Sequence, residues 1–266
     1  MGGEHVLSQK KVILSRKWDV IVILDACRYD VFKKLYGNRF NVLKAETSGT
    51  CTMEWFYNTF KDAEMKDTIY VSGSPYIGTH AVNFKEMNIK YFPPRIFKKV
   101  MDVWRFAFKK IACTYTVDPQ IVYEFFIIAF KLHFPSRFIV HFVQPHAPYP
   151  HCEELAQWFI ANPTCPDKYL WGALRRGKAD VEVARKCYEQ NLRWVMQYVS
   201  KILDIAKQHN LRVIITSDHG EAFGEYGDYN HPCASKNPYL KYVPLVYLKD
   251  GESFDHDKLR AYIRGV

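Results

Sequence analysis

The stretch that decides the fold is RVIITSDHGEAFGEYGDYNHP, residues 212–232. It contains the β-branched run Val213–Thr216, which predicts a strand that is buried on both faces. The pair Asp218-His219 follows, and a second histidine, His231, comes after an acidic segment with several glycines. An Asp in this position is often only a helix N-cap. The rest of the chain must decide whether this pair caps an element or holds a metal.

Four other runs resemble the first one. They are short, apolar and do not alternate, which indicates strands covered on both faces, and they span residues 19–24, 68–71, 138–143 and 243–248. Helical patterns lie between them, and the clearest covers residues 181–209, where apolar side chains recur at helical spacing. Strands separated by helices predict an α/β fold with a mostly parallel sheet.

In such a sheet, ligands bind beyond the carboxyl ends of the strands. Asp25 follows the run at residues 19–24, His146 follows the run at residues 138–143, and Asp218-His219 follow the run Val213–Thr216. Three such coincidences at one edge favour a site over three unrelated loop residues. Two carboxylates and an imidazole are common ligands of transition metals. Asp25, Asp218 and His219 therefore predict a site for one divalent ion, with zinc or manganese preferred and magnesium or calcium as alternatives.

An enzyme built on such a metal also needs a nucleophile. The segment ETSGTCTMEW, residues 46–55, offers several hydroxyls just before and at the start of a helix expected over residues 52–60. A hydroxyl at a helix N-terminus lies in a positive potential that favours bound anions, and a metal would favour its alkoxide. The alternative is an ordinary Ser or Thr helix cap.

The chain is basic, with 37 Lys and Arg against 28 Asp and Glu and a net charge of +9. This excess suggests an anionic partner, or a basic surface kept for solubility. Nucleic acid is not expected, because no recognition motif for it is present. No apolar run approaches the roughly 18–20 residues of a membrane span, so we expect no transmembrane segment and leave peripheral membrane contact and oligomer formation open.

The segment Arg95–Ile111 is basic and aromatic, and its pattern predicts an amphipathic helix. It could pack on the core as a surface helix, lie at an anionic membrane or cap the site. A helical cap or insertion over residues about 90–132 is therefore one possibility.

Seven cysteines occur at irregular spacings, without a CxxC pair. The odd number and the lack of an apolar leader in MGGEHVLSQKK predict a reduced, cytoplasmic chain.

Four motifs together resemble the alkaline phosphatase superfamily, and they span residues 22–30 (VILDACRYD), 48–55 (SGTCTMEW), 143–149 (VQPHAPY) and 217–232. The resemblance is strongest to the sulfatase-like branch, which includes archaeal sulfatase-like proteins, lipoteichoic acid synthases and lipid A phosphoethanolamine transferases. It implies a three-layer α/β/α sandwich, with a single catalytic domain over residues 1–266.

The resemblance also implies roles for individual residues. Asp25, Asp218 and His219 match metal ligands, and Thr50 matches the nucleophile, which also contacts the metal, because it stands four residues before an acid that precedes an aromatic residue. Thr52 is the alternative nucleophile or a substrate contact. Formylglycine chemistry is not expected, because Cys51 lacks the downstream Pro and Arg of sulfatases.

The remaining matches face the substrate. His146 and His231 match catalytic residues that contact the transferred group, or that hold a second ion. Arg28 could contact the anion or pair with Asp30. The resemblance therefore implies a metal-dependent hydrolase or transferase that acts on phosphate or sulfate esters through a covalent threonine intermediate. Its substrate would be an anionic small molecule, glycan or lipid headgroup. The alternative function is a non-catalytic module that binds an anionic glycan or lipid headgroup.

Overall fold

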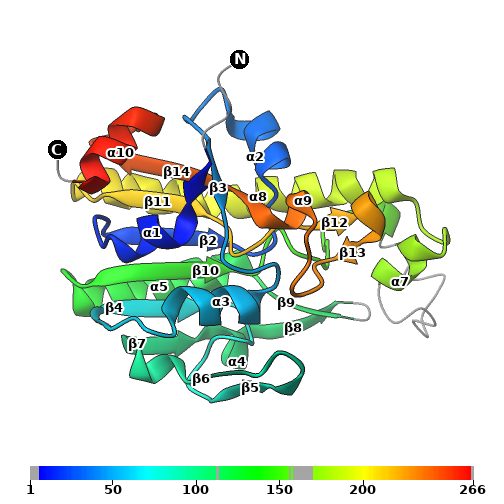
Figure 1. The fold of residues 1–266 in the computed structure, drawn as a ribbon, viewed down its shortest axis with the longest axis horizontal. Coiled ribbons are helices and arrows are strands. Elements are labelled where there is room, and N and C mark those ends of the chain that lie inside the picture. The colour runs from blue at the N-terminus through cyan, green and yellow to red at the C-terminus, as the bar shows by residue number, and fades with distance from the viewer. Residues whose placement is uncertain (1–5, 112–113, 156, 158–169, 265–266) are drawn as a thin grey trace.

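The computed structural model describes residues 6–111, 114–155, 157 and 170–264 (Figure 1). A nine-stranded sheet forms its centre, in the order β1-β3-β14-β11-β2-β10-β4-β7, with β15 paired to β14. Its strands are β1 (Leu7–Ser8), β2 (Val20–Leu24), β3 (Leu43–Glu46), β4 (Met65–Ser72), β7 (Phe97–Asp102), β10 (Arg137–Phe142), β11 (Val213–Thr216), β14 (Tyr242–Lys249) and β15 (Glu252–Ser253).

All five apolar runs of the sequence are strands of this sheet, which confirms that prediction. Strands β11, β2, β10, β4 and β7 are parallel to their neighbours in this part of the sheet. Strand β14 is antiparallel to β11 and β3 on either side of it. The sheet is therefore mixed and mostly parallel, as expected.

Helices cover both faces of the sheet and make the fold a three-layer α/β/α sandwich (Figure 1). On one face Val20, Val22 and Leu24 of β2 pack with α2 (Tyr29–Tyr36), α5 (Pro119–His133) and α8 (Val181–Gln208). On the other face Ile21 and Ile23 pack with α1 (Gln9–Leu14), α3 (Thr52–Phe60) and α10 (His256–Arg264). The strand does not alternate because neither of its faces meets water.

The long helix predicted over residues 181–209 is α8, and Asp180 is its N-cap residue. The Asp180 side chain accepts hydrogen bonds from the amides of Glu182 and Val183, and so satisfies two free N–H groups of the first turn. Smaller elements complete the described chain, namely α4 (Val103–Ala107), α7 (Leu170–Arg175), α9 (Pro238–Lys241), the 3-10 turns η1 (Lys85–Met87), η2 (Pro93–Arg95) and η3 (Glu225–Gly227), and the hairpins β5–β6 (Val82–Phe84, Ile89–Tyr91), β8–β9 (Phe108–Ile111, Thr114–Val117) and β12–β13 (Ala222–Phe223, Tyr229–Asn230).

The prediction of one amphipathic helix over Arg95–Ile111 is wrong. Most of this segment is the edge strand β7, then the short helix α4, then the first strand of the β8–β9 hairpin. Phe97 and Val100 are buried in the core while β7 pairs with β4, and this pairing overrides the helical periodicity. A helical cap or insertion was one possibility for residues 90–132. In the structure, β7 is a strand of the central sheet and α5 packs on one face of it, so both belong to the sandwich.

The prediction of reduced cysteines is wrong for four of the seven. Cys51 forms a disulfide with Cys233, and Cys152 forms one with Cys187. Cys27 is a buried free thiol, and Cys113 and Cys165 lie outside the described residues. The pattern misled because Cys51 and Cys233 are 182 residues apart, and only the fold brings them together.

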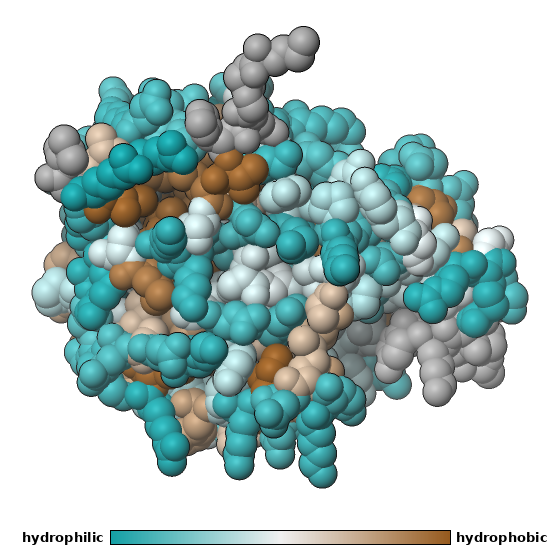
Figure 2. All heavy atoms as spheres, in the orientation of Figure 1, coloured by the Kyte–Doolittle hydropathy of each residue, from teal (hydrophilic) through white to brown (hydrophobic). Residues whose placement is uncertain are grey.

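Figure 2 shows that hydrophilic residues cover most of one face, with hydrophobic residues gathered beside α10 and β3. Within the described part of the chain, no helix combines the length and the apolar character needed to cross a membrane.

Candidate active site

The candidate site lies where three neighbouring parallel strands end. Strand β2 stands between β11 and β10, so the residues that follow these three strands meet at one edge of the sheet. Asp25 follows β2, Asp218 and His219 follow β11, and His146 follows β10. The structure therefore brings together the residues that the sequence placed at the strand ends.

Asp25, Asp218 and His219 form the first cluster, with one ligand atom from each lying within 4.8 Å of the others. The His219 Nε2 atom is 3.3 Å from Asp218 Oδ2 and 3.7 Å from Asp25 Oδ1. The His219 Nδ1–H donates to the Gly220 carbonyl oxygen at 2.9 Å. This bond leaves the Nε2 lone pair facing the carboxylates, which is the tautomer that a metal ligand needs.

The electrostatics of the first cluster fit a cation. Burial raises the pKa of Asp25 well above its ordinary value, and the nearby carboxylates of Asp218 and Glu221 raise it further. Burial also acts to raise the pKa of Asp218, but His219, His141 and hydrogen bonds outweigh it and lower that pKa. Burial lowers the pKa of His219, which keeps its ring neutral. A divalent ion would supply the charge that two adjacent buried carboxylates lack.

Thr52, the first residue of α3, belongs to this cluster. Its hydroxyl donates to Asp218 Oδ2 at 2.8 Å, and its oxygen lies 3.2 Å from His219 Nε2. The hydroxyl therefore stands at a helix N-terminus beside two candidate metal ligands. This is the position that an activated nucleophile requires.

Thr50, which was expected to be the nucleophile and a metal ligand, lies outside the cluster. Its hydroxyl donates to the Pro232 carbonyl oxygen at 2.8 Å and accepts from the Ser235 amide at 3.0 Å. Its own amide donates to Glu54 Oε2 at 2.8 Å. The spacing from Thr50 to Glu54 thus serves a local hydrogen bond, and Thr50 ties its turn to the segment that follows His231.

The Cys51–Cys233 disulfide reinforces the same connection. Cys51 is the N-cap residue of α3, immediately before Thr52. The Ala234 amide, one residue beyond Cys233, donates to Glu54 Oε2 at 3.0 Å. A covalent bond and several hydrogen bonds therefore hold the start of α3 against the His231 segment.

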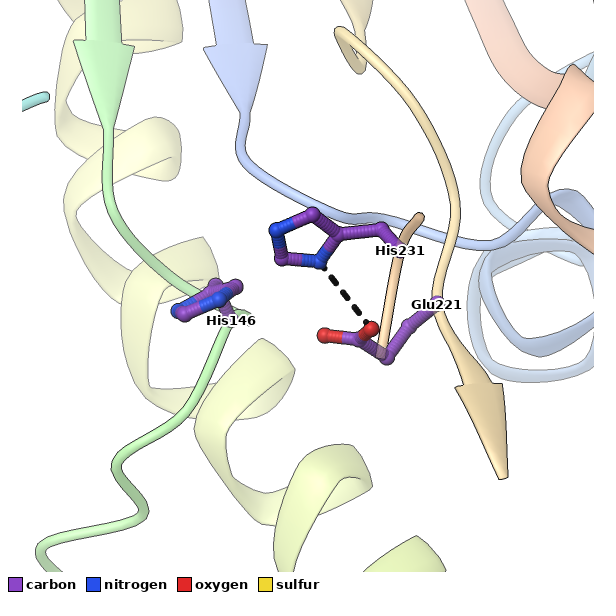
Figure 3. Close-up of side chains that lie close together, drawn as sticks. All are labelled: His146, Glu221 and His231. Atoms are coloured by element: carbon purple, nitrogen blue, oxygen red, sulfur yellow. Dashed lines mark hydrogen bonds and ion pairs between the residues drawn. The ribbon is translucent and has the colours of Figure 1, made fainter. Parts of the chain in front are cut away.

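His146, Glu221 and His231 form a second cluster, drawn in Figure 3. Glu221 Oε1 lies 3.2 Å from His231 Nδ1, while its buried Oε2 has no hydrogen-bond partner among the described residues. The His146 Nδ1–H donates to the Ala147 carbonyl oxygen. The His231 ring stands 4.3 Å from the His219 ring between centroids, so the two clusters are in contact.

Burial sets the charge of the second cluster. It lowers the pKa of His146 and of His231 to about 4, so both rings are neutral at physiological pH. It raises the pKa of Glu221 to about 7, which leaves this carboxyl partly protonated near neutrality. Two neutral imidazoles and one carboxyl can hold a second cation, or they can exchange a proton with a reacting group.

Sequence reasoning missed two site residues. Glu221 was visible as the acid after Asp218-His219, but no role was assigned to it. His141 lies inside the apolar run of β10, and its Nε2 is 3.9 Å from Asp25 Oδ2 and 3.8 Å from Asp218 Oδ2. Its Nδ1 is 2.8 Å from the hydroxyl of Tyr70, which fixes the ring. A polar residue inside a strand buried on both faces was the signal available for His141.

A cavity of about 450 Å³ opens over both clusters. Asp25, Thr52, His146 and His231 line it together with five aromatic side chains, namely Tyr76, Phe108, Tyr115, Tyr149 and Trp171. Arg28, which was expected either at the substrate or in an ion pair, is 2% exposed, pairs with Asp30 and Glu225 and is not a lining residue.

Comparisons with known proteins agree with this architecture. The model of the family described as Sulfatase matches residues 55–253, about three quarters of the chain. The match begins after Asp25, Thr50 and Thr52, so it does not include these three residues. A search of the curated proteins found no match.

Solved structures with a similar fold include two described as phosphoethanolamine transferases, and the periplasmic domain of EcEptC. The integral membrane lipooligosaccharide enzyme EptA of Neisseria meningitidis has a TM-score of 0.54 and 14% identity, and covers 86% of this chain and 47% of its own. The periplasmic domain of EptC from Campylobacter jejuni has a TM-score of 0.54, 16% identity and coverages of 92% and 81%. That of EcEptC from Escherichia coli, in complex with Zn, has a TM-score of 0.54, 14% identity and coverages of 88% and 74%. The chain thus spans about half the length of the neisserial enzyme.

Proposed function

Because this chain belongs to the sulfatase family, we propose that it is a metal-dependent hydrolase or transferase of phosphate or sulfate esters. The observation that carries the proposal is the position of the Thr52 hydroxyl. It lies 2.8 Å from Asp218 Oδ2 and 3.2 Å from His219 Nε2, and Thr52 lines the cavity. A serine or threonine hydroxyl beside a metal-ligand set is the arrangement of a covalent catalyst.

Asp25, Asp218 and His219 would hold the metal, and the Thr52 oxygen lies beside them. Such an ion would lower the pKa of the hydroxyl and polarise the ester. Carboxylate and imidazole donors suit zinc or manganese. The Escherichia coli structure of similar fold is described as a zinc complex, which supports the preference for zinc.

In the proposed reaction the Thr52 oxygen attacks the phosphorus or sulfur atom of the ester. The bond between that atom and the oxygen of the leaving alcohol breaks. The hydroxyl proton has an acceptor at Asp218 Oδ2. The departing oxygen needs a proton, and Glu221, with its pKa near 7, can supply one through His231, which it contacts. Water then releases the acid from Thr52 in a hydrolase, or a second alcohol accepts the group in a transferase.

His146 and His231 line the same cavity as Thr52 and have their own part in the proposal. The neutral ring of His231, which lies beside His146, can donate a hydrogen bond to an oxygen of the transferred group. The single N–H of neutral His146 is already donated to the Ala147 carbonyl oxygen, so its Nε2 is available only as an acceptor or a metal ligand. With Glu221 the two histidines could instead hold a second ion, for which the unpartnered Oε2 atom is a free ligand. Metal counting by mass spectrometry would separate one bound ion from two.

The test is a screen of chromogenic esters against zinc, manganese, magnesium and calcium. The esters are p-nitrophenyl phosphate, bis(p-nitrophenyl) phosphate and p-nitrophenyl sulfate. We expect Thr52→Ala to abolish turnover of whichever ester is cleaved, and Thr52→Ser to retain part of it. Thr50→Ala is the matched control, because it removes a hydroxyl two residues away and should leave kcat nearly unchanged. Full activity of Thr52→Ala would overturn the assignment.

The screen also tests the alternative of a non-catalytic module. If the protein binds a metal at Asp218 but cleaves none of the esters, the binding function gains support over the catalytic one.

A further inference from the structure

Exposed apolar side chains are concentrated on one part of the surface. Six of the nine large exposed apolar side chains among the described residues come from α4, the β8–β9 hairpin and α5 with its cap, namely Phe106, Phe108, Tyr115, Ile128, Leu132 and Phe134. Phe106 is 76% exposed and Leu132 is 70% exposed. Single exposed apolar residues are ordinary, but a group of them marks an interaction surface.

Contacts join these side chains into one surface. The Phe106 ring stacks on Phe125 of α5, with centroids 6.4 Å apart and planes within 18°. Phe125, Ile128 and Leu132 follow at helical spacing and share one face of α5. We call Phe106, Phe108, Tyr115, Phe125, Ile128 and Leu132 the apolar ridge.

One end of the ridge reaches the candidate active site. Phe108 stacks on Tyr115 across the hairpin, with centroids 5.1 Å apart and planes within 9°. Both rings line the cavity that holds Thr52 and His146. Trp104 of α4 contacts Phe108, with centroids 6.0 Å apart, and so connects the hairpin to α4. Whatever covers the ridge therefore lies at the mouth of the cavity.

Basic side chains accompany the ridge. Arg105, Lys109, Lys110 and Lys131 are exposed on the same elements. Near the end of α5, burial lowers the pKa of His133, and the charges of Lys99 and Lys98 lower it further, which places both lysines beside this helix end. Three acids lie on these elements: Asp102 pairs with Arg105, Asp118 caps α5, and Glu124 accepts a hydrogen bond from Gln120. Against them, residues 97–134 carry six lysines and arginines. The net charge around the ridge is positive.

We propose that the apolar ridge and its basic residues bind an anionic lipid membrane. Aromatic and aliphatic side chains would enter the headgroup region, while lysines and Arg105 would contact anionic headgroups. A membrane explains both parts of the surface, because it offers an apolar interior beneath a negative layer. The cavity mouth would then face the membrane surface. That a headgroup ester enters the cavity rests on the proposed function, whereas membrane binding does not.

The experiment is cosedimentation of the full chain with phosphatidylcholine vesicles, with and without phosphatidylserine. We expect binding to the anionic vesicles that weakens with salt. Lys109→Glu with Lys110→Glu should weaken it at least about tenfold, because two basic residues that attract anionic headgroups are replaced by acids. Phe106→Ser with Leu132→Ser should weaken it at least about tenfold too, because two large apolar side chains no longer enter the headgroup region. These side chains are exposed, so unchanged melting temperatures should show that the fold is intact. Lys258→Glu on α10 is the charge control and should bind like the unmodified protein.

Several results would overturn the inference. The first is that the unmodified protein does not bind anionic vesicles. The second is that the ridge variants bind these vesicles as well as the unmodified protein does. The third is that Lys258→Glu weakens vesicle binding as much as the ridge variants do. A change of oligomeric state in the Phe106→Ser, Leu132→Ser variant without vesicle binding would identify the ridge as a protein interface instead. Thr52→Ala should bind vesicles normally. Vesicle binding without turnover of any ester would defeat only the proposed function, and turnover without vesicle binding would defeat only this inference.

Discussion

Glu221 leads to the sharpest prediction about the stability of the metal-free protein. Its side chain is fully buried, and burial raises its pKa from 4.5 to about 7 against the opposing effect of nearby histidines and Arg28. At pH 8 the carboxyl is ionised in a site with two other carboxylates, Asp25 and Asp218. We expect Glu221→Gln to stabilise the chelated protein at pH 8 and to have little effect at or below pH 4.5.

The direction follows from proton binding. Between pH 4.5 and pH 7 the folded protein keeps a proton on Glu221 that the unfolded chain has released, so this carboxyl lowers the free energy of unfolding as pH rises. The pKa difference corresponds to about 3 kcal/mol at most, which is fully lost above pH 7. For a chain of this size, that amount shifts the melting temperature by roughly 6 to 12 °C.

Thermal melts of the chelated protein and of Glu221→Gln at pH 5, 6, 7 and 8 would measure this effect. Burial lowers the pKa of His141, His146 and His231 to about 4, so over this range they are neutral in the folded protein and titrate only in the unfolded chain. Their contributions largely cancel when the two proteins are compared. Glu124→Gln, at an exposed glutamate of α5, is the matched control and should show no pH-dependent difference. If the difference in melting temperature between the unmodified protein and Glu221→Gln does not grow with pH, the reasoning is refuted.

Three further predictions concern residues around the site. Asp218→Asn should bind less zinc in metal analysis, and zinc should no longer raise its melting temperature; an unchanged zinc response would contradict the ligand assignment. Replacing Cys51 and Cys233 together by Ser should lower the free energy of unfolding by about 2–4 kcal/mol in denaturant titrations, and a reducing agent should then have less effect on the variant than on the unmodified protein. His141→Phe should weaken zinc binding about 10–100-fold in calorimetry. The reason is that the His141 Nε2 lies 3.9 Å from the Asp25 carboxylate and 3.8 Å from that of Asp218, and so helps to orient both proposed ligands. The substitution should also cost about 1–3 kcal/mol of stability by leaving the Tyr70 hydroxyl without its partner, and adding Tyr70→Phe should restore part of that stability but not the zinc affinity.

The fold and half of the site could be predicted because their signals are local. A strand covered on both faces has a continuous apolar run, as β2 does, and the residue after it must lie at the carboxyl edge of the sheet. Asp25, Asp218 and His219 needed no further information to be placed there. The strand order β11-β2-β10 then brought them within ligand distance of one another.

The choice between Thr50 and Thr52 could not be made in this way. Both hydroxyls flank Cys51, and sequence spacing does not say which one faces Asp218. In the structure the Thr50 hydroxyl donates to the carbonyl oxygen of Pro232, 182 residues away, and the Thr52 hydroxyl donates to Asp218. Our proposal of Thr52 rests on these long-range contacts. The disulfide depends on the same long-range contact. A cytoplasmic location therefore stays a prediction, without the support of a fully reduced chain.

The cross-link between Cys51 and Cys233 has a consequence for how the chain could be divided. Strand β3, shortly before Cys51, also pairs with β14, shortly after Cys233. An N-terminal and a C-terminal part of the chain are therefore joined both by a disulfide and by the hydrogen bonds of a strand pair. A single backbone cut anywhere between the two cysteines leaves one covalent molecule. The chain could therefore be made as two complementing fragments, one carrying Thr52 and the other carrying Asp218, in which oxidation restores the link between the halves of the site.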